Sequence, residues 1–257
     1  MTFPRRAARP HLKVRVRDVT DVTAHMRQIE LTGPDLSRLR VRPGAHLVIR
    51  IPNVAGSSTA RRVYSIWSHR PAASSLTIRV ALHDVGGPGC VWAQAAAPGD
   101  RLEVEQPRTK ITLDATADFH LFLGDETGAV PLLAMHAALL RTETPASGVA
   151  GRRLDPPVFG VFESADPGDE MPGPDNVPPL PWVHRNGASA VASRVLLRAA
   201  QNLDLPAGRG AAYIAGESDT CRLIQRHLIE QRGWSRRSVH TQPQWAHGRP
   251  GFGAGGD

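Results

Sequence analysis

The sequence predicts a small antiparallel β-barrel followed by an α/β domain that is built on a parallel sheet. Between residues 12 and 104, short alternating apolar segments are separated by Gly- and Pro-rich turns about every ten residues, which is typical of a small barrel. Near residue 118 the pattern changes to near-continuous apolar runs that alternate with helical segments. This second pattern is typical of a parallel sheet covered on both faces. The length of 257 residues suits two such domains.

The barrel domain is expected over residues 11–115, the α/β domain over residues 116–248, and a flexible Gly-rich tail over residues 249–257. Within the barrel, apolar side chains alternate between two faces, as the side chains of a strand do. The expected barrel strands cover residues 12–19, 26–31, 47–51, 62–68, 76–82 and 102–104.

The second domain is expected to alternate strands with helices. Its strands should cover residues 119–123, 158–162, 181–185 and 211–215. A turn at residues 124–127 should lead into a helix over 131–140, Ser189 should cap a second helix, and a third should follow Gly216-Glu217-Ser218. The loops over residues 142–157 and 163–181 leave strand ends, where such folds commonly bind ligands.

The composition favours a cytoplasmic protein with small anionic partners. The formal net charge of +7, almost all from arginine, favours anions. Cys90 and Cys221 lie too far apart for a metal motif, and the histidines are scattered, so we expect no metal site and a reduced compartment. No secretory signal is present, and no run approaches the roughly 18 apolar residues that span a membrane. The arginines form no basic helix, which argues against nucleic acid.

The segment 62–65 carries the first candidate site. Because side chains alternate along a strand, Arg62 and Tyr64 are expected to point one way, and Val63 and Ser65 the other. A flavin dinucleotide needs such groups, because its pyrophosphate binds a cation, its ring packs on a flat face, and its reactive nitrogen takes a hydrogen bond. The alternative is an ordinary strand with its tyrosine in the core and its arginine in solvent.

A predicted helix start follows this strand by about 20 residues. Gly87-Pro88-Gly89-Cys90 places a proline in the first turn and leaves backbone N–H groups uncovered. A bare helix N-terminus binds phosphate readily. A tight turn into a short helix explains the segment equally well when it is taken alone. Together with Arg62 and Tyr64, the phosphate interpretation is favoured.

Motifs along the whole chain resemble the siderophore-interacting protein family, within the ferredoxin reductase superfamily. The resemblance runs from about residue 12 to about residue 248, and several motifs occur in the family's order. They are Arg62-x-Tyr64-Ser65, His83 with Gly87-Pro88-Gly89-Cys90-x-Trp92-Ala93, Pro98-Gly99-Asp100, Gly124-Asp125-Glu126-Thr127 followed by Pro131, Trp182-x-x-Arg185, and Ala215-Gly216-Glu217.

This resemblance implies an FAD-dependent oxidoreductase that reduces Fe(III) in siderophores to Fe(II). The implied electron donor is NAD(P)H or a reduced ferredoxin, and the implied protein is a monomer. The iron should need no protein ligands, because the siderophore supplies hard oxygen donors that bind Fe(II) less well. By position, the implied cofactor-binding residues are Arg62, Val63, Tyr64, Ser65, His83, Gly87, Pro88, Gly89, Cys90, Asp125, Thr127, Gly216 and Glu217. Arg185, Arg236 and Arg237 are candidates for substrate binding, and no catalytic residue is implied.

Two departures from the family pattern keep a second hypothesis open. Gly89-Cys90 stands where the family usually has Ala-Ser, and Gln244-Trp245-Ala246 stands where it often has Tyr-Trp-Arg. The alternative is therefore a diverged protein that binds flavin or siderophore without turnover. A reductase component that feeds an oxygenase is a further possibility, but the chain has no cysteine cluster for an iron–sulfur centre.

Overall fold

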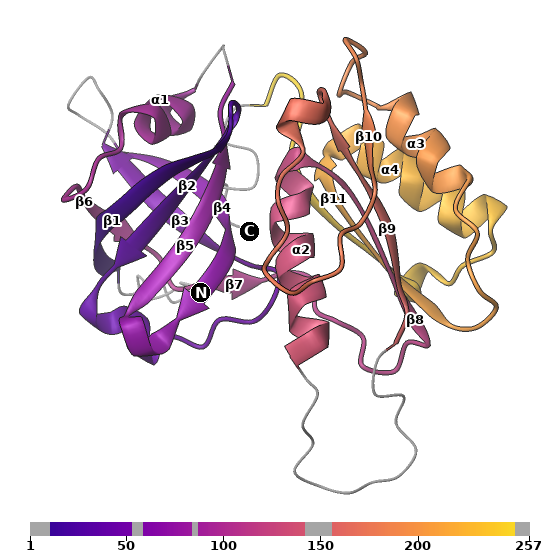
Figure 1. Cartoon of the computed structure of the whole chain (residues 1–257), viewed down its shortest axis with the longest axis horizontal. Helices are drawn as coiled ribbons and strands as arrows, with labels where there is room; N and C mark the ends of the chain where they lie inside the picture. Colours follow the sequence, from indigo (N-terminus) through magenta and orange to yellow (C-terminus); the bar gives the residue numbers. More distant parts are fainter. Residues whose placement is uncertain (1–10, 53–58, 84–86, 142–155, 250–257) are drawn as a thin grey trace, which may run out of the picture.

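The computed structural model describes residues 11–52, 59–83, 87–141 and 156–249. It consists of a barrel and an α/β unit that lie side by side, with one long helix between them (Figure 1). The basic arm expected over residues 1–10, most of the loop over 142–157, and residues 250–257 of the expected tail lie outside the described residues.

Six antiparallel strands close the barrel in the order β4-β5-β2-β1-β6-β3, and β3 pairs back to β4. Alternate side chains such as Val14, Ile29, Ile49 and Ile78 fill its interior, which confirms the predicted barrel. The strands are β1 (Leu12–Thr23), β2 (Met26–Thr32), β3 (Ala45–Pro52), β4 (Thr59–Arg70), β5 (Ser75–Ala81), β6 (Arg101–Val104) and the short added β7 (Arg108–Thr109).

Helix α1 (Pro88–Ala95) covers one end of the barrel (Figure 1). Its Ala93 is fully buried against the barrel core, and Trp92 packs beside it. The proline at the first helical position and the preceding Gly87 begin the helix as the sequence predicted.

The second unit is a five-stranded parallel sheet in the order β10-β9-β8-β11-β12. Helix α2 covers one face, and α3 and α4 cover the other (Figure 1). The strand order reverses between β8 and β11, and folds of this kind bind ligands beyond the carboxyl ends of the strands at such a switch point. The elements are β8 (Phe119–Asp125), α2 (Glu126–Arg141), β9 (Val158–Ser164), β10 (Trp182–His184), α3 (Arg194–Gln201), β11 (Gly210–Glu217), α4 (Ser218–Arg226) and β12 (Val239–Trp245).

Two helix starts differ from the prediction. Strand β8 runs straight into α2 at Glu126, with no turn and well before Pro131. The reason is that the Asp125 carboxylate accepts hydrogen bonds from the Thr127 and Gly128 backbone N–H groups and so caps the helix there. Helix α3 is capped by Ser193, whose hydroxyl accepts from Leu196 N at 3.3 Å, and not by Ser189.

Helix α2 joins the two units. Its buried face packs on the sheet through Phe122 and Tyr213, and the same apolar cluster includes Met26 and Trp67 of the barrel. A second tie is Arg79 of β5, which stacks 3.5 Å above the Trp67 ring and donates to the Pro172 carbonyl at 2.8 Å. The position of the barrel relative to the sheet is therefore fixed by contacts from both units.

The close approach of α2 to β11 gives the first testable prediction. A Cβ added at Gly128 would lie 2.1 Å from the Ala215 carbonyl oxygen, which is backbone and has nowhere to move. We expect Gly128→Ala to lower the free energy of unfolding by about 2–4 kcal/mol, measured by urea denaturation. Gly173→Ala adds the same methyl group into open space and is the matched control. Equal stability of the two variants would contradict this account of the helix packing.

Candidate functional site: a pocket between the barrel and the α/β unit

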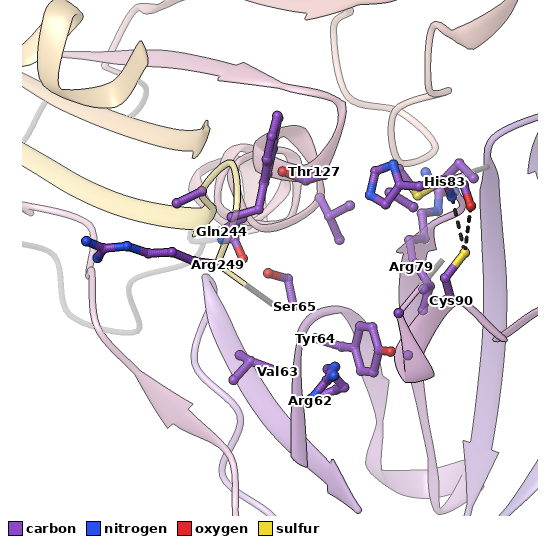
Figure 2. Close-up of a pocket in the computed structure, with 18 of the residues that line it drawn as sticks. Arg62, Val63, Tyr64, Ser65, Arg79, His83, Cys90, Thr127, Gln244 and Arg249 are labelled. Atoms are coloured by element: carbon purple, nitrogen blue, oxygen red, sulfur yellow. Dashed lines mark hydrogen bonds between the residues drawn. The ribbon is translucent and has the colours of Figure 1, made fainter. Parts of the chain in front are cut away.

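The candidate site is a pocket of about 610 Å³ where the barrel meets α2 and the end of β12 (Figure 2). It brings together most of the cofactor-binding residues predicted in the barrel. From the barrel side these are Arg62, Val63, Tyr64, Ser65, His83, Gly87, Gly89 and Cys90; Thr127 of α2 and residues 244–249 form the opposite wall.

Arg62 and Tyr64 both reach toward α1, as their alternation on the strand predicted. A Cβ at Gly89 would lie 2.5 Å from the Tyr64 hydroxyl and 3.2 Å from Arg62 Cγ, so only glycine allows this approach. The Tyr64 ring packs 5.7 Å from that of Trp92, and burial raises the pKa of its hydroxyl. The ring is thereby held as a neutral flat surface in the pocket wall.

The two neighbouring arginines on β4 differ in their partners. Arg61 donates at 2.7 Å to the Glu105 carboxylate, which also accepts from Arg108 at 2.8 Å. Arg62 donates to the Arg61 carbonyl at 2.8 Å and pairs with no carboxylate in the described part of the chain. Of the two arginines, Arg62 lines the pocket. A guanidinium that has no carboxylate partner among the described residues suits an anionic group there.

Ser65 offers an unused hydrogen bond to the pocket. Its side chain is 5% exposed, and among the described residues its hydroxyl oxygen has no hydrogen-bond partner. A buried hydroxyl without a partner is costly, so the site is suited to a ligand that completes the bond. In Figure 2 Ser65 points toward the side of the pocket where Gln244 lies. The Gln244 amide nitrogen is also buried and has no hydrogen-bond partner in the part of the chain that the structure describes.

In the first turn of α1, Pro88 has no N–H and Cys90 N donates to the Gly87 carbonyl at 2.9 Å, so among the described residues Gly89 N is the backbone donor left for the same pocket. Gly87 caps the helix without any side-chain hydrogen bond, and the space around it is open. Cys90, in the first turn, accepts from His83 N at 3.2 Å and donates to the His83 carbonyl at 3.3 Å, which ties α1 to the end of β5. Together with Arg62 this bare N-terminus suits a pyrophosphate, so the barrel wall fits a flavin dinucleotide.

Asp125, Gly216 and Glu217 lie behind the pocket and not in its lining. Asp125 Oδ2 accepts from Trp245 Nε1 at 2.9 Å and from Glu217 N at 2.8 Å, so this carboxylate positions the far wall. Gly216 has a φ of +131°, a conformation that favours glycine. These residues hold the wall in place, while Thr127 and Trp245 face the pocket.

The three predicted substrate arginines are not brought together. Arg185 lines an adjoining pocket of about 510 Å³, where its guanidinium is bonded to both Glu126 and Glu163. Arg236 lines a separate hollow between α3 and α4, and Arg237 lines neither of these. Their assignment as substrate ligands has no support from this arrangement.

Several pocket residues were missed by the sequence reasoning. Met26 and Arg79 come from strands that were assigned only to the barrel core, and Arg249 was assigned to the tail. Trp245 was noted in the C-terminal motif, but its bond to Asp125 depends on two residues that are far apart in the chain. No local sequence pattern indicates that Met26 and Arg79 line a pocket.

His46 lies on β3 directly opposite Ser65 on β4. It is 3% exposed, and its Nδ1 has no partner among the described residues. Burial, together with the charges of Lys110 and Arg108, lowers the pKa of His46 from 6.5 to about 4. The imidazole beside the pocket is therefore neutral at physiological pH.

The fold and the pocket define a ferredoxin reductase-like protein with an FAD-binding barrel. A family model described as siderophore-interacting FAD-binding domain matches residues 53–111, and one described as siderophore-interacting protein matches residues 117–248. The chain belongs to the siderophore-interacting protein family.

Several known proteins are similar to this chain in sequence or structure, and some of them are named as siderophore proteins. The chain is 25% identical over 248 residues to the ferric vibriobactin reductase ViuB of Vibrio cholerae, with 89% of this chain and 86% of ViuB covered. A siderophore utilization protein from T. fusca is 29% identical with a TM-score of 0.75, covering 95% of this chain and 96% of that one. Phthalate dioxygenase reductase shares the fold, with 21% identity and a TM-score of 0.65. The match covers 91% of this chain and 68% of the chain of that reductase.

Within the described residues, no helix is long and apolar enough to cross a membrane. The longest described helix, α2, has 16 residues and lies between the two units.

The contact between Gly89 and Tyr64 predicts an effect on flavin affinity. In Gly89→Ala the new methyl group would displace the Tyr64 ring and Arg62, so we expect FAD to bind about tenfold more weakly, measured by fluorescence titration. The double variant Gly89→Ala/Tyr64→Phe removes the hydroxyl that the methyl group meets, and should recover part of the affinity. Unchanged affinity in the single variant would show that the Tyr64 ring does not contact the flavin.

The lowered pKa of His46 predicts a pH dependence of stability. Between pH 6.5 and about 4 the unfolded chain binds a proton at this residue and the folded chain does not, so stability falls as pH decreases through this window. We expect His46→Gln to flatten the fall by up to about 3 kcal/mol, measured by urea unfolding at a series of pH values. His11→Gln, at an exposed histidine, is the control. An identical pH profile in wild type and His46→Gln would exclude the assignment.

Proposed function

We propose that the chain is a flavin-dependent reductase of ferric siderophores. The observation that carries the proposal is the convergence of Arg62, the Tyr64 ring, the unpartnered Ser65 hydroxyl and the start of α1 on one pocket. The pocket lies where the proposed barrel domain (11–115) meets the proposed α/β domain (116–248). Family membership and the likeness to a ferric vibriobactin reductase support the same reaction.

The pocket residues would divide the work as follows. Arg62 and the Gly89 N–H at the start of α1 would bind the pyrophosphate, and Tyr64 would pack against the flavin ring. Ser65 would hydrogen-bond to the reactive edge of the ring, because a hydroxyl both donates and accepts. Thr127 and Trp245, on the opposite wall, would limit the access of water to this edge. FAD, when bound, supplies the capacity to take electrons from a donor and pass them singly to Fe(III).

The iron enters as part of the substrate. A siderophore binds Fe(III) through hard oxygen donors, and these hold Fe(II) less firmly, so reduction releases the metal. The protein then needs only to bring the chelate near the flavin edge. We place the reaction in the cytoplasm, because Cys90 and Cys221 are free and a reduced compartment keeps them so. NAD(P)H and a reduced ferredoxin both stay proposed donors.

A two-stage experiment tests the reductase function. The purified protein is mixed with FAD, freed of excess, and its visible spectrum recorded; we expect a bound flavin. It is then reduced anaerobically with dithionite and mixed with a ferric hydroxamate or ferric catecholate chelate and an Fe(II) trap. We expect one trapped Fe(II) for each electron that leaves the flavin. A reduced flavin that persists in the presence of both chelates would favour the alternative, a binding protein without turnover.

Ser65→Ala should slow the transfer of electrons to the chelate by about 10- to 100-fold while FAD stays bound. The reason is that the variant loses a buried hydroxyl that lines the pocket and has no partner among the described residues. Ser68→Ala, further along the same strand and outside the pocket lining, is the matched control. If Ser65→Ala lost FAD but transferred electrons to the chelate at an unchanged rate per bound flavin, Ser65 would serve only to bind the cofactor.

A further inference from the structure

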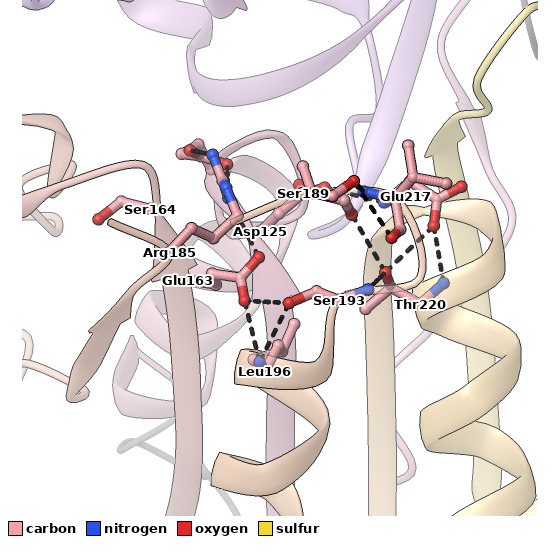
Figure 3. A network of polar contacts seen from close by, with 12 residues as sticks. Asp125, Glu163, Ser164, Arg185, Ser189, Ser193, Leu196, Glu217 and Thr220 are labelled. Atoms are coloured by element: carbon pink, nitrogen blue, oxygen red, sulfur yellow. Dashed lines mark hydrogen bonds and ion pairs between the residues drawn. The ribbon is translucent and has the colours of Figure 1, made fainter. Parts of the chain in front are cut away.

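In the described part of the chain, three helix N-termini lie at the carboxyl edge of the parallel sheet, and each is bonded to a carboxylate from a strand end. Figure 3 labels these side chains, which are Asp125, Glu163 and Glu217. At the end of β8, Asp125 accepts from Thr127 N at 2.9 Å and from Gly128 N at 3.0 Å, both in α2. The same side chain accepts from Glu217 N and from Trp245 Nε1. Asp125 therefore fills the crevice between β8 and β11, where the strand order reverses.

Glu163 performs the same role at the end of β9. Its Oε2 accepts from Leu196 N at 2.9 Å, in the first turn of α3, and from the Ser193 hydroxyl. Its other oxygen accepts from Arg185 at 3.1 Å, and Arg185 is bonded to Glu126 as well. The one arginine in the loop after β10 is thus shared by two carboxylates and is only 10% exposed.

Glu217 completes the series at the end of β11. Its Oε2 accepts from Thr220 N at 2.8 Å, in the first turn of α4, and from Ala192 N at 3.1 Å. We call Asp125, Glu163 and Glu217 the carboxylate belt. Every N-terminus that a phosphate would use on this edge is already bonded to an anion of the chain itself.

The loop after β9 adds negative charge to this edge. Residues 165–181 contain four carboxylates and no lysine, arginine or histidine. Asp166, Glu170 and Asp175 are exposed. In folds that bind NADP, the adenosine phosphate is commonly met by an arginine near the end of the second strand of the sheet, and acidic residues there oppose it. Strand β9 holds that second position here.

We infer that the carboxylate belt and the acidic loop 165–181 exclude the phosphate groups of a nicotinamide dinucleotide from the switch point. NADPH then has no phosphate anchor at the switch point, and the donor that reduces the flavin docks without one there. The inference rests on the proposed function only in taking bound FAD as the electron acceptor. The residues concerned determine which donor is rejected, and none of them lines the flavin pocket.

A binding measurement tests the inference without any turnover. The protein, with FAD present, is titrated with NADP⁺ by calorimetry, and we expect no saturable binding up to about 1 mM. The titration is repeated without FAD, so that failure of the chain to hold flavin does not affect the result. Saturable binding with a Kd below about 100 µM would overturn the inference and would leave the reduction of the chelate by dithionite-reduced flavin unaffected.

A kinetic comparison gives a second readout. Anaerobic bleaching of the bound flavin is followed with NADPH and with N-benzyl-1,4-dihydronicotinamide, which carries the same hydride-donating ring and no phosphate. The ratio of the two rate constants is expected to match the ratio for free FAD within about threefold, since remote phosphates add nothing without a site. A ratio more than tenfold in favour of NADPH, relative to free FAD, would refute the inference.

Charge reversal in the loop separates repulsion from other causes. Asp175 is exposed, and its side chain makes no hydrogen bond or ion pair with the described residues, so Asp175→Lys changes the charge without breaking a contact. At low ionic strength we expect it to speed reduction by NADPH several-fold and to leave the phosphate-free donor unchanged. Glu230→Lys makes the same change of charge at an exposed residue beyond the far end of α4. Equal effects of the two substitutions would contradict a local role for the loop.

Discussion

The arrangement of the α/β unit depends on the buried carboxylate of Asp125. One side chain bonds the first turn of α2, the end of β11 and the indole of Trp245. Gly216 is required beside it, because a Cβ there would lie 2.6 Å from the Asp125 carboxyl carbon. A buried carboxylate is tolerated when several donors satisfy it, and removal of the charge would leave those donors without partners. The position of α2 follows from this set of bonds.

Through α2 the same constraint reaches the barrel and the pocket. The helix carries Thr127 into the pocket at its first turn, and it buries Leu133 and Met135 in the cluster that also holds Trp67 of the barrel. The opposite wall is set within the barrel, where the absence of a side chain at Gly89 lets α1 approach Tyr64. The width of the pocket thus depends on packing in both units, and neither forms the site alone.

Local patterns predicted the barrel and the parallel sheet, because alternation and continuous apolar runs directly reflect which faces are buried. Residues 62–65 and 87–90 were selected as site candidates for the same reason: the groups they present follow from their own backbone. The start of α2 was predicted too late, because Pro131 gave a stronger local signal than the Asp125 cap. The pairing of Arg185 with Glu126 and Glu163 joins the residue after β10, the start of α2 and the end of β9, and no spacing along the chain reveals it. Arg79 reached the pocket by the same kind of long-range packing.

The net charge of +7 does not show that basic and acidic side chains gather in different regions of the folded chain. One hollow on the barrel is lined by four basic residues, Lys13, Arg15, Arg50 and Arg101. In the loop after β9, by contrast, every charged side chain is a carboxylate. The overall positive field attracts any anion, but each anion must then bind at a particular place. Under the proposed function, a ferric chelate has to reach only the pocket, whose barrel wall carries Arg62, which pairs with no carboxylate among the described residues. Under the further inference, a dinucleotide would have to lay its phosphates along the carboxyl edge, where the described helix N-termini are already bonded to carboxylates. On this proposal the two anions are distinguished by where their charges must bind, and not by the total charge of the chain.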